Sequence, residues 1–578
     1  MPAGELQGGV LRLRLEIREG SWHPEDDHGQ SLTVQAFAEE GAPMQIPGPL
    51  LRVPEGTEVH ASVHNRLSTI ATVHGLHERP GDPDAGIRVD PGETREAVFK
   101  AGVPGSYYYW ATTTEKPLGA REGIETQLSG AFIVDPSTGP LPGRIFVIGL
   151  WYQMPDSSHP FHQVLVINGK SWPYNEVLNY GLHSNIRWVW LNTSGSPHPM
   201  HLHGNFFRVD SVGDGEKDIT YDAADRRTVF TELMTPGSTM SLDWTPAMPG
   251  RWIFHCHILS HISSDLLLSP TADPNSIAGD HTGQMAGLVL GIRVASSPTE
   301  IAPPDHNLPV RQLRLFVRNR PARDGLSAGY AYQVQDGQSE PSPDAATVPG
   351  SPLVLTRGQP VEITVVNESD EPTTVHWHGI QVPSYYDGVP GFGGIGTLIT
   401  PAIAPGTSFV ARYTPPHAGT FFYHTHWHDV LQLTGGLYGS LVVMPPEQTF
   451  DPSIDKVFVI GRGGPDLVMD PLLVNGSANP PALSLKSGIT YRFRFINITP
   501  DESETNVTLL AGGSPVNWRP IAKDANELSP ASQVPRPASQ TVAVGETYDF
   551  EFQPLEPGDL ALKVTSIKNT VVTPIQVR

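Results

Sequence analysis

The sequence predicts an all-β protein made of four Greek-key β-sandwich domains, and three observations lead to that prediction. Gly and Pro number 57 each among 578 residues, a mixture typical of many short strands joined by turns. The hydrophobic fraction of 38% argues against disorder, and no long segment has apolar residues at helical spacing. The third observation is an internal repeat, which recurs in every quarter of the chain.

In each quarter of the chain, a glycine preceded by proline or alanine leads into an apolar strand. These glycines are Gly105, Gly250, Gly419 and Gly558. The positions five and seven residues after each glycine hold, in chain order, Trp110 and Thr112, His255 and His257, His424 and His426, and Lys563 and Thr565. We therefore expect four domains in two tandem pairs, with boundaries at residues 1–140, 141–300, 301–447 and 448–578.

Charge and hydropathy restrict the partners and the location of the protein. A formal net charge of −22 repels phosphate backbones, so we expect no nucleic-acid partner. No apolar run approaches the roughly 18 residues that span a bilayer. The first five residues, Met1 to Glu5, lack the basic and apolar regions of a signal peptide. Export would rely on a segment that has been removed, or the protein stays inside the cell, and the sequence leaves both open.

Four histidine clusters carry the chemistry of the sequence. They contain, in chain order, His198, His201 and His203; His255, Cys256 and His257 with His261; His376 and His378; and His424 and His426. Side chains two apart on a strand point to the same face, so each His-x-His pair can present two imidazoles to one metal cluster. An isolated pair of nearby histidines is more often surface decoration or a core pair, which is our interpretation of His74 and His77.

Cys256 is the single cysteine, so no intramolecular disulfide can form. On a strand it faces away from His255 and His257, and with His198 and His261 it can make a His₂Cys site. One thiolate with two imidazoles is the blue-copper arrangement, whereas zinc would prefer more thiolates or carboxylates. A metal at the thiolate would thus be linked by a few covalent bonds to metals at the flanking histidines.

These motifs resemble those of the multicopper oxidases, the group that contains laccases, ferroxidases and bacterial cuprous oxidases. The resemblance implies four cupredoxin-like domains and four coppers per chain: one type 1, one type 2 and two type 3. It implies type 1 ligands at His198, Cys256 and His261, and type 2 ligands at His201 and His376. It implies type 3 ligands at His203, His255, His257, His378, His424 and His426.

The order of the motifs differs from that of three-domain laccases. Here the cysteine-bearing domain is second and the His-Trp-His-Gly domain is third, so the trinuclear site should form between the second and third domains. The first and fourth domains have no ligands at the matching positions, and we expect them to be structural. A site shared with another chain is a less economical alternative, and the sequence leaves the choice between a monomer and a small homo-oligomer open.

Two further roles follow from the resemblance. We favour Met285 over Leu266 as the axial ligand of the type 1 copper, which requires an inserted loop from about Leu267 to Thr282. Asp387, soon after the His-Trp-His-Gly motif, is the candidate proton relay, although an Asp-Gly turn would explain it nearly as well. Ile262 stands where bacterial relatives often have a second acidic residue.

The resemblance implies an extracytoplasmic enzyme, periplasmic or secreted, which couples four one-electron oxidations to the reduction of O2 to two waters. Phenols and aromatic amines are the default reductants. An oxidase of Fe(II), Cu(I) or Mn(II) is the alternative enzyme, and Asp210, Glu232 or Asp265 would have to lie beside the type 1 site for the iron reaction. A non-enzymatic copper-binding assembly is the alternative outside enzymes. A copper nitrite reductase is disfavoured because it lacks the paired His-x-His set.

Overall fold

The structure is a computed structural model, and it describes residues 2–155, 161–268, 285–295, 309–323, 325–464, 471–500, 504–567 and 569–578. Its elements are almost entirely β-strands, which confirms the predicted all-β class. Alternating sequences form these strands: along β5 (Glu58–Asn65) and β26 (Val361–Asn367), every second side chain is buried. Among the described residues, no helix has the length and apolar character needed to cross a bilayer.

The first two sandwiches are formed by residues 5–135 and 144–295, each from two sheets. The first contains β1 (Glu5–Gln7), β2 (Val10–Trp22), β3 (Leu32–Glu39), β4 (Gly48–Pro54), β5, β6 (Ala71–His74), β7 (Gly86–Val89), β8 (Thr94–Lys100), β9 (Gly105–Thr112) and β10 (Ser129–Asp135). The second contains β11 (Arg144–Gln153), β12 (His162–Ile167), β13 (Leu178–Gly181), β14 (Ile186–Asn192), β15 (His198–Leu202), β16 (Phe207–Gly213), β17 (Asp218–Thr220), β18 (Arg227–Val229), β19 (Thr231–Met234), β20 (Thr239–Trp244), β21 (Gly250–Cys256) and β22 (Val289–Ala295).

The other two sandwiches follow in residues 311–444 and 455–577. The third contains β23 (Arg311–Arg320), β24 (Gly329–Gln335), β25 (Gly350–Thr356), β26, β27 (His376–His378), β30 (Ser408–Tyr413), β31 (Gly419–His424), the short helix α1 (Asp429–Gln432) and β32 (Tyr438–Met444). The short strands β28 (Gly394–Ile395) and β29 (Leu398–Ile399) belong to the same segment of the chain but extend the sheet of the second sandwich, where β28 pairs with β21. The fourth contains β33 (Asp455–Arg462), β34 (Leu472–Val474), β35 (Leu483–Leu485), β36 (Tyr491–Asn497), β37 (Glu504–Ala511), β38 (Ser514–Pro515), β39 (Asn517–Lys523), β40 (Asn526–Glu527), β41 (Arg536–Pro537), β42 (Ser539–Ala543), β43 (Thr547–Phe552), β44 (Gly558–Thr565) and β45 (Thr570–Val577).

All four sandwiches share one strand order. In one sheet of each, two strands pair in parallel: β2 with β5, β11 with β14, β23 with β26, and β33 with β36. The other sheet repeats a second parallel pair: β4 with β10, β13 with β22, β25 with β32, and β35 with β45. The predicted repeat glycines each begin a strand, namely β9, β21, β31 and β44. The chain therefore contains four copies of one Greek-key sandwich.

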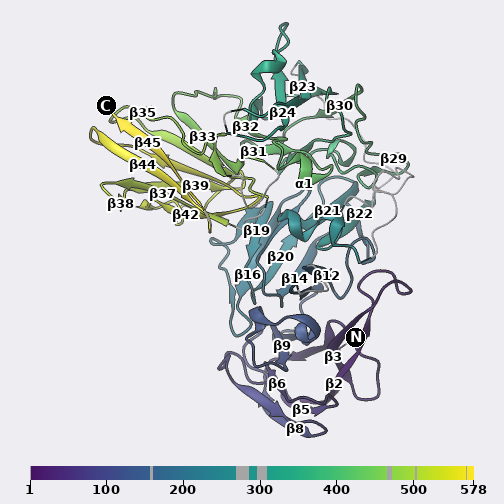
Figure 1. Ribbon diagram of the computed structural model, residues 1–578. Helices are drawn as coiled ribbons and strands as arrows, with labels where there is room; N and C mark the ends of the chain where they lie inside the picture. The colour runs from purple at the N-terminus through teal and green to yellow at the C-terminus, as the bar shows by residue number, and fades with distance from the viewer. Residues whose placement is uncertain are drawn as a thin grey trace.

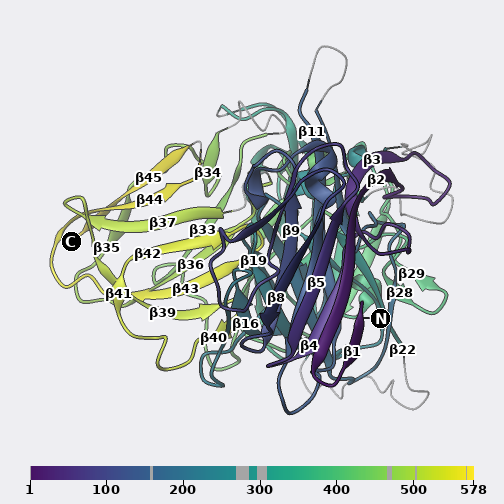
Figure 2. The same ribbon diagram turned by 90° about the horizontal axis from the view of Figure 1, so that it is seen from below.

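Figure 1 shows how the four sandwiches are arranged, with the first at the bottom, the second and third above it, and the fourth at the left. Seen from below, the strands of the first sandwich lie in front and the fourth extends to one side (Figure 2). The first and fourth sandwiches have hydrophobic cores of their own. The second and third share one continuous core, which runs across their interface. The proposed boundaries at 140 and 447 lie between sheets, and the one at 300 lies outside the described residues.

Candidate metal centre

The predicted histidine pairs lie at the ends of neighbouring strands. In the second domain β15 pairs with β21, and this register sets His201 opposite His255. In the third domain β27 pairs with β31, which sets His376 opposite His424. Each domain therefore presents its histidines as a compact group on one sheet, and all of them are buried.

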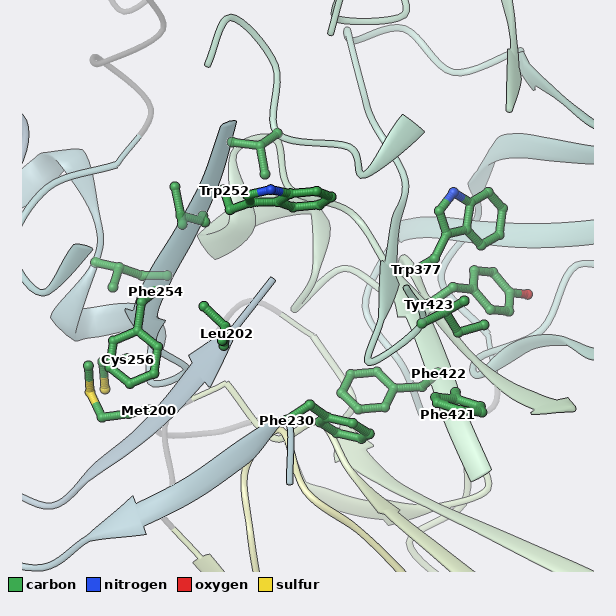
Figure 3. Packing of buried hydrophobic residues seen from close by; sticks show 14 of the residues in the cluster. Met200, Leu202, Phe230, Trp252, Phe254, Cys256, Trp377, Phe421, Phe422 and Tyr423 are labelled. Atoms are coloured by element: carbon green, nitrogen blue, oxygen red, sulfur yellow. The ribbon is translucent and has the colours of Figure 1, made fainter. Parts of the chain in front are cut away.

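The two groups meet across the interface between the second and third domains. His201 Nε2 lies 3.4 Å from His376 Nε2. The His201 ring stacks on His378 with centroids 3.7 Å apart, and the His203 ring stacks on His376 at 3.9 Å. Figure 3 shows buried aromatic side chains of both domains, among them Trp252 and Phe422. The Phe422 ring stacks on His378 with centroids 3.9 Å apart. One buried cluster thus unites eight imidazoles from two domains.

The ligand atoms of this cluster divide into groups that could each hold one ion. Their ring nitrogens lie within 4.8 Å of one another in His203, His255 and His426, and likewise in His257, His378 and His424. If each imidazole is used once, His201 and His376 are left as a pair. Each trio takes ligands from both domains, so neither domain could form the site alone.

Hydrogen bonds on the outer side of the rings fix their orientation. Nδ1–H of His201 donates to the Phe230 carbonyl at 2.8 Å, that of His255 to the Cys256 carbonyl at 2.7 Å, and that of His424 to the Thr425 carbonyl at 2.6 Å. Their Nε2 atoms are thereby left for the centre. This is how metal-binding histidines are usually held.

His378 is held the other way round. Its Nε2–H donates to the carbonyl of Gly545, in the fourth domain, at 3.0 Å, and its buried Nδ1 has no hydrogen-bond partner. Both ring nitrogens of His257 and of His426, and Nε2 of His424, are likewise buried without a hydrogen-bond partner. Buried polar atoms without partners are costly. Bound metal ions would satisfy one nitrogen of each of these rings, so the residues fit a metal centre.

Burial also sets the protonation state of these rings. Desolvation lowers the pKa of His255 to about 3, and it lowers the pKa values of His201, His203, His257 and His378 well below the usual 6.5. Because the neutral imidazole is the metal-binding form, these histidines need not release a proton at neutral pH before they bind.

A second site lies on the other face of β21, around Cys256. The sulfur lies 3.4 Å from His261 Nδ1 and 3.8 Å from His198 Nδ1, and the two ring nitrogens are 3.1 Å apart. Ser194 Oγ lies 2.8 Å from Nε2 of His198 and orients that ring. Burial raises the pKa of the Cys256 thiol to about 12, so a bound cation is needed to form the thiolate. One sulfur and two imidazole nitrogens therefore lie close enough to hold one ion.

The axial position of this second site stays a prediction. Met285 is buried, forms an isolated bridge with Ser263, and lies in the same core cluster as Cys256. Leu266 ends the short 3-10 helix η4 (Ser264–Leu266), and its side chain lies outside the described residues. Of the expected insertion from Leu267 to Thr282, residues 269–282 also lie outside them.

Asp387 lies beside two ligands of the larger cluster. Its Oδ2 accepts a hydrogen bond from His203 Nδ1–H at 2.8 Å, and its carbonyl accepts one from His376 Nδ1–H at 2.9 Å. Asp387 is 1% exposed, and burial raises the pKa of its carboxyl group. The turn interpretation is also compatible with the structure, because Asp387 follows the last residue of the 3-10 helix η7 (Ser384–Tyr386). Asp387 is therefore both a turn residue and a neighbour of the cluster.

The carboxylates considered for an iron site are mostly engaged elsewhere. Asp210 pairs with Arg187 and Arg208. Glu232 pairs with Arg227 and with Lys523 of the fourth domain. Asp265 is exposed on η4, four residues after His261, and its backbone N–H donates to Ser263 Oγ. Only Asp265 is both exposed and close in sequence to the second site.

The matching positions of the first and fourth domains differ chemically. In the first, His74 is paired with Trp110 and its ring stacks on the indole with centroids 4.2 Å apart. His77 Nε2 lies 2.9 Å from Glu216. In the fourth, Lys563 is paired with Thr508. None of these residues belongs to a metal-binding group among the residues that the structure describes.

Contacts from the fourth domain were missed in the sequence. Besides the Gly545 carbonyl, the carboxylate of Asp524 accepts hydrogen bonds from the backbone N–H groups of Phe230 and Thr231. A glycine and an aspartate in turns have no pattern that separates them from ordinary loop residues, so no signal could have identified them.

Comparison with known proteins agrees with this geometry. A family model described as multicopper oxidase matches residues 149–276, and a second with the same description matches residues 40–139 and 345–448. The second model therefore matches both the first and the third domain, in keeping with two tandem pairs.

Individual relatives match shorter segments. Multicopper oxidase MCE of Talaromyces pinophilus is 38% identical over 135 residues, which are 23% of this chain and 21% of that protein. Laccase 1 of Metarhizium acridum is 39% identical over 101 residues, 17% of this chain and 15% of that protein. The chain thus matches about a fifth or less of the length of these relatives.

Solved structures are also similar. The blue copper oxidase of Nitrosomonas europaea is 20% identical, with a TM-score of 0.38, and the match covers 50% of this chain and 89% of that one. Because the two family models together match more than half of the residues, the chain belongs to the multicopper oxidase family.

Proposed function

We propose that the protein is a laccase-like oxidase, which couples four one-electron oxidations of a small reductant to the reduction of O2 to two waters. One observation carries this proposal: eight imidazoles from two domains meet in one buried cluster, and Cys256 of a second site is covalently adjacent to two of them. Such a pair of linked sites separates electron entry from the reaction with dioxygen.

The family binds copper, and the donor set fits that metal because it combines many neutral imidazoles with one thiol. We assign His198, Cys256 and His261 to the type 1 copper, with Met285 as the axial ligand. We assign His201 and His376 to the type 2 copper. The two trios, His203 with His255 and His426, and His257 with His378 and His424, would hold the type 3 pair, for four coppers per chain.

Bound copper supplies the one-electron redox chemistry and the binding of dioxygen. The protein supplies the geometry. His261 is 7% exposed whereas His198 and Cys256 are fully buried, so a reductant would approach at His261. Cys256 is bonded through the backbone to His255 and His257, which gives the shortest covalent path between the two sites. Asp387, hydrogen-bonded to ligands, is the group placed to hold a proton there.

The proposed reductants are phenols and aromatic amines. The resemblance to a laccase over 101 residues supports this choice. An oxidase of Fe(II), Cu(I) or Mn(II) is the second candidate, since the exposed carboxylate of Asp265 lies four residues from His261. We also propose an extracytoplasmic location, in the periplasm or outside the cell, with small molecules rather than macromolecules as partners.

Oxygen consumption by the copper-loaded protein tests the proposal. A catechol-type phenol, Fe(II), Cu(I) and Mn(II) would be supplied separately, with the copper-free protein as the control. The expected result is about four electrons from a phenol for each O2 consumed, with no accumulation of hydrogen peroxide. Faster turnover of a metal ion than of any phenol would favour the second candidate. Full copper loading without oxygen consumption would indicate a non-enzymatic copper-binding protein.

A further inference from the structure

Two loops of the ligand-free fourth domain reach the interface between the second and third domains. One joins β39 to β40 and contains Asp524, and the other joins β42 to β43 and contains Gly545 and Glu546. Asp524 is fully buried and Glu546 is 3% exposed. Polar loop residues are usually solvated, so the burial of both carboxylates calls for a specific role.

Asp524 holds the segment that orients one ligand. Its Oδ2 accepts hydrogen bonds from Phe230 N–H at 3.3 Å and Thr231 N–H at 3.0 Å, and its Oδ1 accepts one from Thr547 N–H at 2.9 Å. The Phe230 carbonyl and the Thr231 hydroxyl in turn accept from His201 Nδ1–H at 2.8 Å and 3.1 Å. A carboxylate of the fourth domain is thus two hydrogen bonds away from an imidazole of the second.

Gly545 contacts two more ligands directly. Its carbonyl accepts from His378 Nε2–H at 3.0 Å and thereby leaves Nδ1 of that ring for the centre. A Cβ atom at this position would come within 3.0 Å of Cγ and Cδ2 of His257, and the backbone φ is +85°. Only glycine combines that backbone conformation with that close approach.

A buried ion-pair network fixes both loops to the second domain. Lys523 Nζ lies 2.5 Å from Glu232 Oε2 on β19 and 2.7 Å from Glu546 Oε1. Arg227 also pairs with Glu232. Lys523 is adjacent to Asp524, and Glu546 is adjacent to Gly545. Buried ion pairs add little net stability but can select one relative position of two surfaces.

We propose that the fourth domain is a working part of the copper centre: Asp524 and Gly545 are positioning residues that hold His201, His257 and His378 in their binding orientations. This inference rests on the proposed function, because it assigns these three imidazoles to copper. The rival interpretation is that the fourth domain only stabilises the fold. The two differ in what a substitution changes, since loss of stability alone would leave the copper spectra of the folded protein intact.

The test compares matched variants of the full-length, copper-loaded protein. Asp524→Asn keeps the shape of the side chain but removes one of two hydrogen-bond acceptors. Its control is Asp549→Asn, a buried carboxylate of the same domain that bonds Thr420 and Arg494 of the third and fourth domains. Gly545→Ala is compared with Gly513→Ala, which has a similar φ of +88° but no atom within 4 Å of the added Cβ.

Copper per chain and the electron paramagnetic resonance of the type 2 copper are the readouts, with the blue type 1 band as internal reference. We expect Asp524→Asn and Gly545→Ala to weaken copper binding at the trinuclear site about 10–100-fold, with an unchanged blue band. Asp524→Asn acts on the type 2 ligand His201 and should alter or remove the type 2 signal. Gly545→Ala acts on the type 3 ligands His257 and His378 and should lower the copper content per chain. Asp549→Asn and Gly513→Ala should retain the wild-type signals.

Wild-type copper content and resonance in all folded variants would overturn the inference while leaving the proposed function intact. Equal changes in the test and control variants would overturn it too, because a general loss of stability would then explain them. A wild-type protein that binds no type 2 copper would instead contradict the proposed function itself. If Gly545→Ala fails to fold, Asp524→Asn alone decides, because it preserves side-chain volume.

Discussion

Strands β21 and β31 can be compared with strands β9 and β44 at their C-terminal ends, because all four strands begin at an equivalent glycine. In β31 the last five residues are buried, and they end at His424. In β44 the corresponding end is only half-buried, with Lys563 and Thr565 at the ligand positions. The backbone supplies the same positions four times, but only the strand ends buried between the second and third domains carry imidazoles.

The first domain shows a second way to lack a site. Trp110 occupies the position of His424, and His74 occupies that of His376. The guanidinium of Arg121 lies over the Trp110 ring, 5.4 Å from its centroid, and is itself buried. A fixed positive charge beside an indole is a poor environment for a cation. The comparison teaches that the fold supplies the positions, whereas side-chain chemistry and a buried partner face make the centre.

Removal of the thiol should have the largest effect on the ligand-bearing half. Cys256→Ser takes away the sulfur ligand, which would connect a metal at this site to the backbone path to His255 and His257. We expect oxidation of a phenol to fall by at least about a thousandfold and the blue band to disappear. Steady-state oxygen uptake and the visible spectrum measure both. Turnover within a few-fold of wild type would show that electrons enter elsewhere.

The ion pairs of Glu232, which attach the ligand-free fourth domain to the second, should make the free energy of unfolding depend on pH in the acid range. Burial alone would raise the pKa of Glu232, but the charges of Lys523 and Arg227 lower it to about 2. Because the folded-state pKa is depressed, the stability from Glu232 is present above the unfolded value of 4.5 and is lost as the pH falls towards 2. Glu232→Gln should cost about 3 kcal/mol near neutral pH.

Urea unfolding of wild type and Glu232→Gln at several pH values measures this difference. It should be largest above pH 4.5 and should shrink as the pH falls towards about 2. The paired comparison removes the contribution of the histidines, which both proteins share. A difference that is independent of pH would mean that the carboxylate charge is not what joins the two domains.

Asp387 provides a milder test within the ligand-bearing half. Asp387→Asn retains a carbonyl-type acceptor for His203 but cannot hold a transferable proton. Oxygen turnover should fall about 10–100-fold, with copper content and the blue band unchanged. Steady-state kinetics and metal analysis on the same sample check this. Loss of copper in step with activity would make Asp387 a structural turn residue only.

The smallest effect is expected where histidines are added to a ligand-free domain. The double variant Lys563→His and Thr565→His recreates the pattern of β31 on β44. It should bind no additional copper, because Thr508 faces position 563 and the strand end is half-buried. Metal analysis after removal of loosely bound ions measures this. A fifth tightly bound copper would contradict this account, since histidine side chains alone would then be enough to form a copper site without a buried partner face.

The fold class, and the placement of both histidines of a pair on one face of a strand, could be predicted from the sequence because both depend on local periodicity. Alternation along a strand is enough to separate Cys256 from His255 and His257. The division of the eight imidazoles into trios could not be predicted, since it depends on how two domains dock. The contacts of Asp524 and Gly545 could not be predicted either, because a turn carboxylate and a backbone carbonyl have no recognisable sequence pattern.

The central claim is that one chain builds a type 1 site around Cys256 and a trinuclear site between its second and third domains. Copper analysis of the fully loaded protein, combined with electron paramagnetic resonance, tests it most directly. The account predicts four coppers per chain, of which two are detected by resonance and two are silent because they are coupled. Four coppers that are all detected, or a single copper per chain, would contradict it.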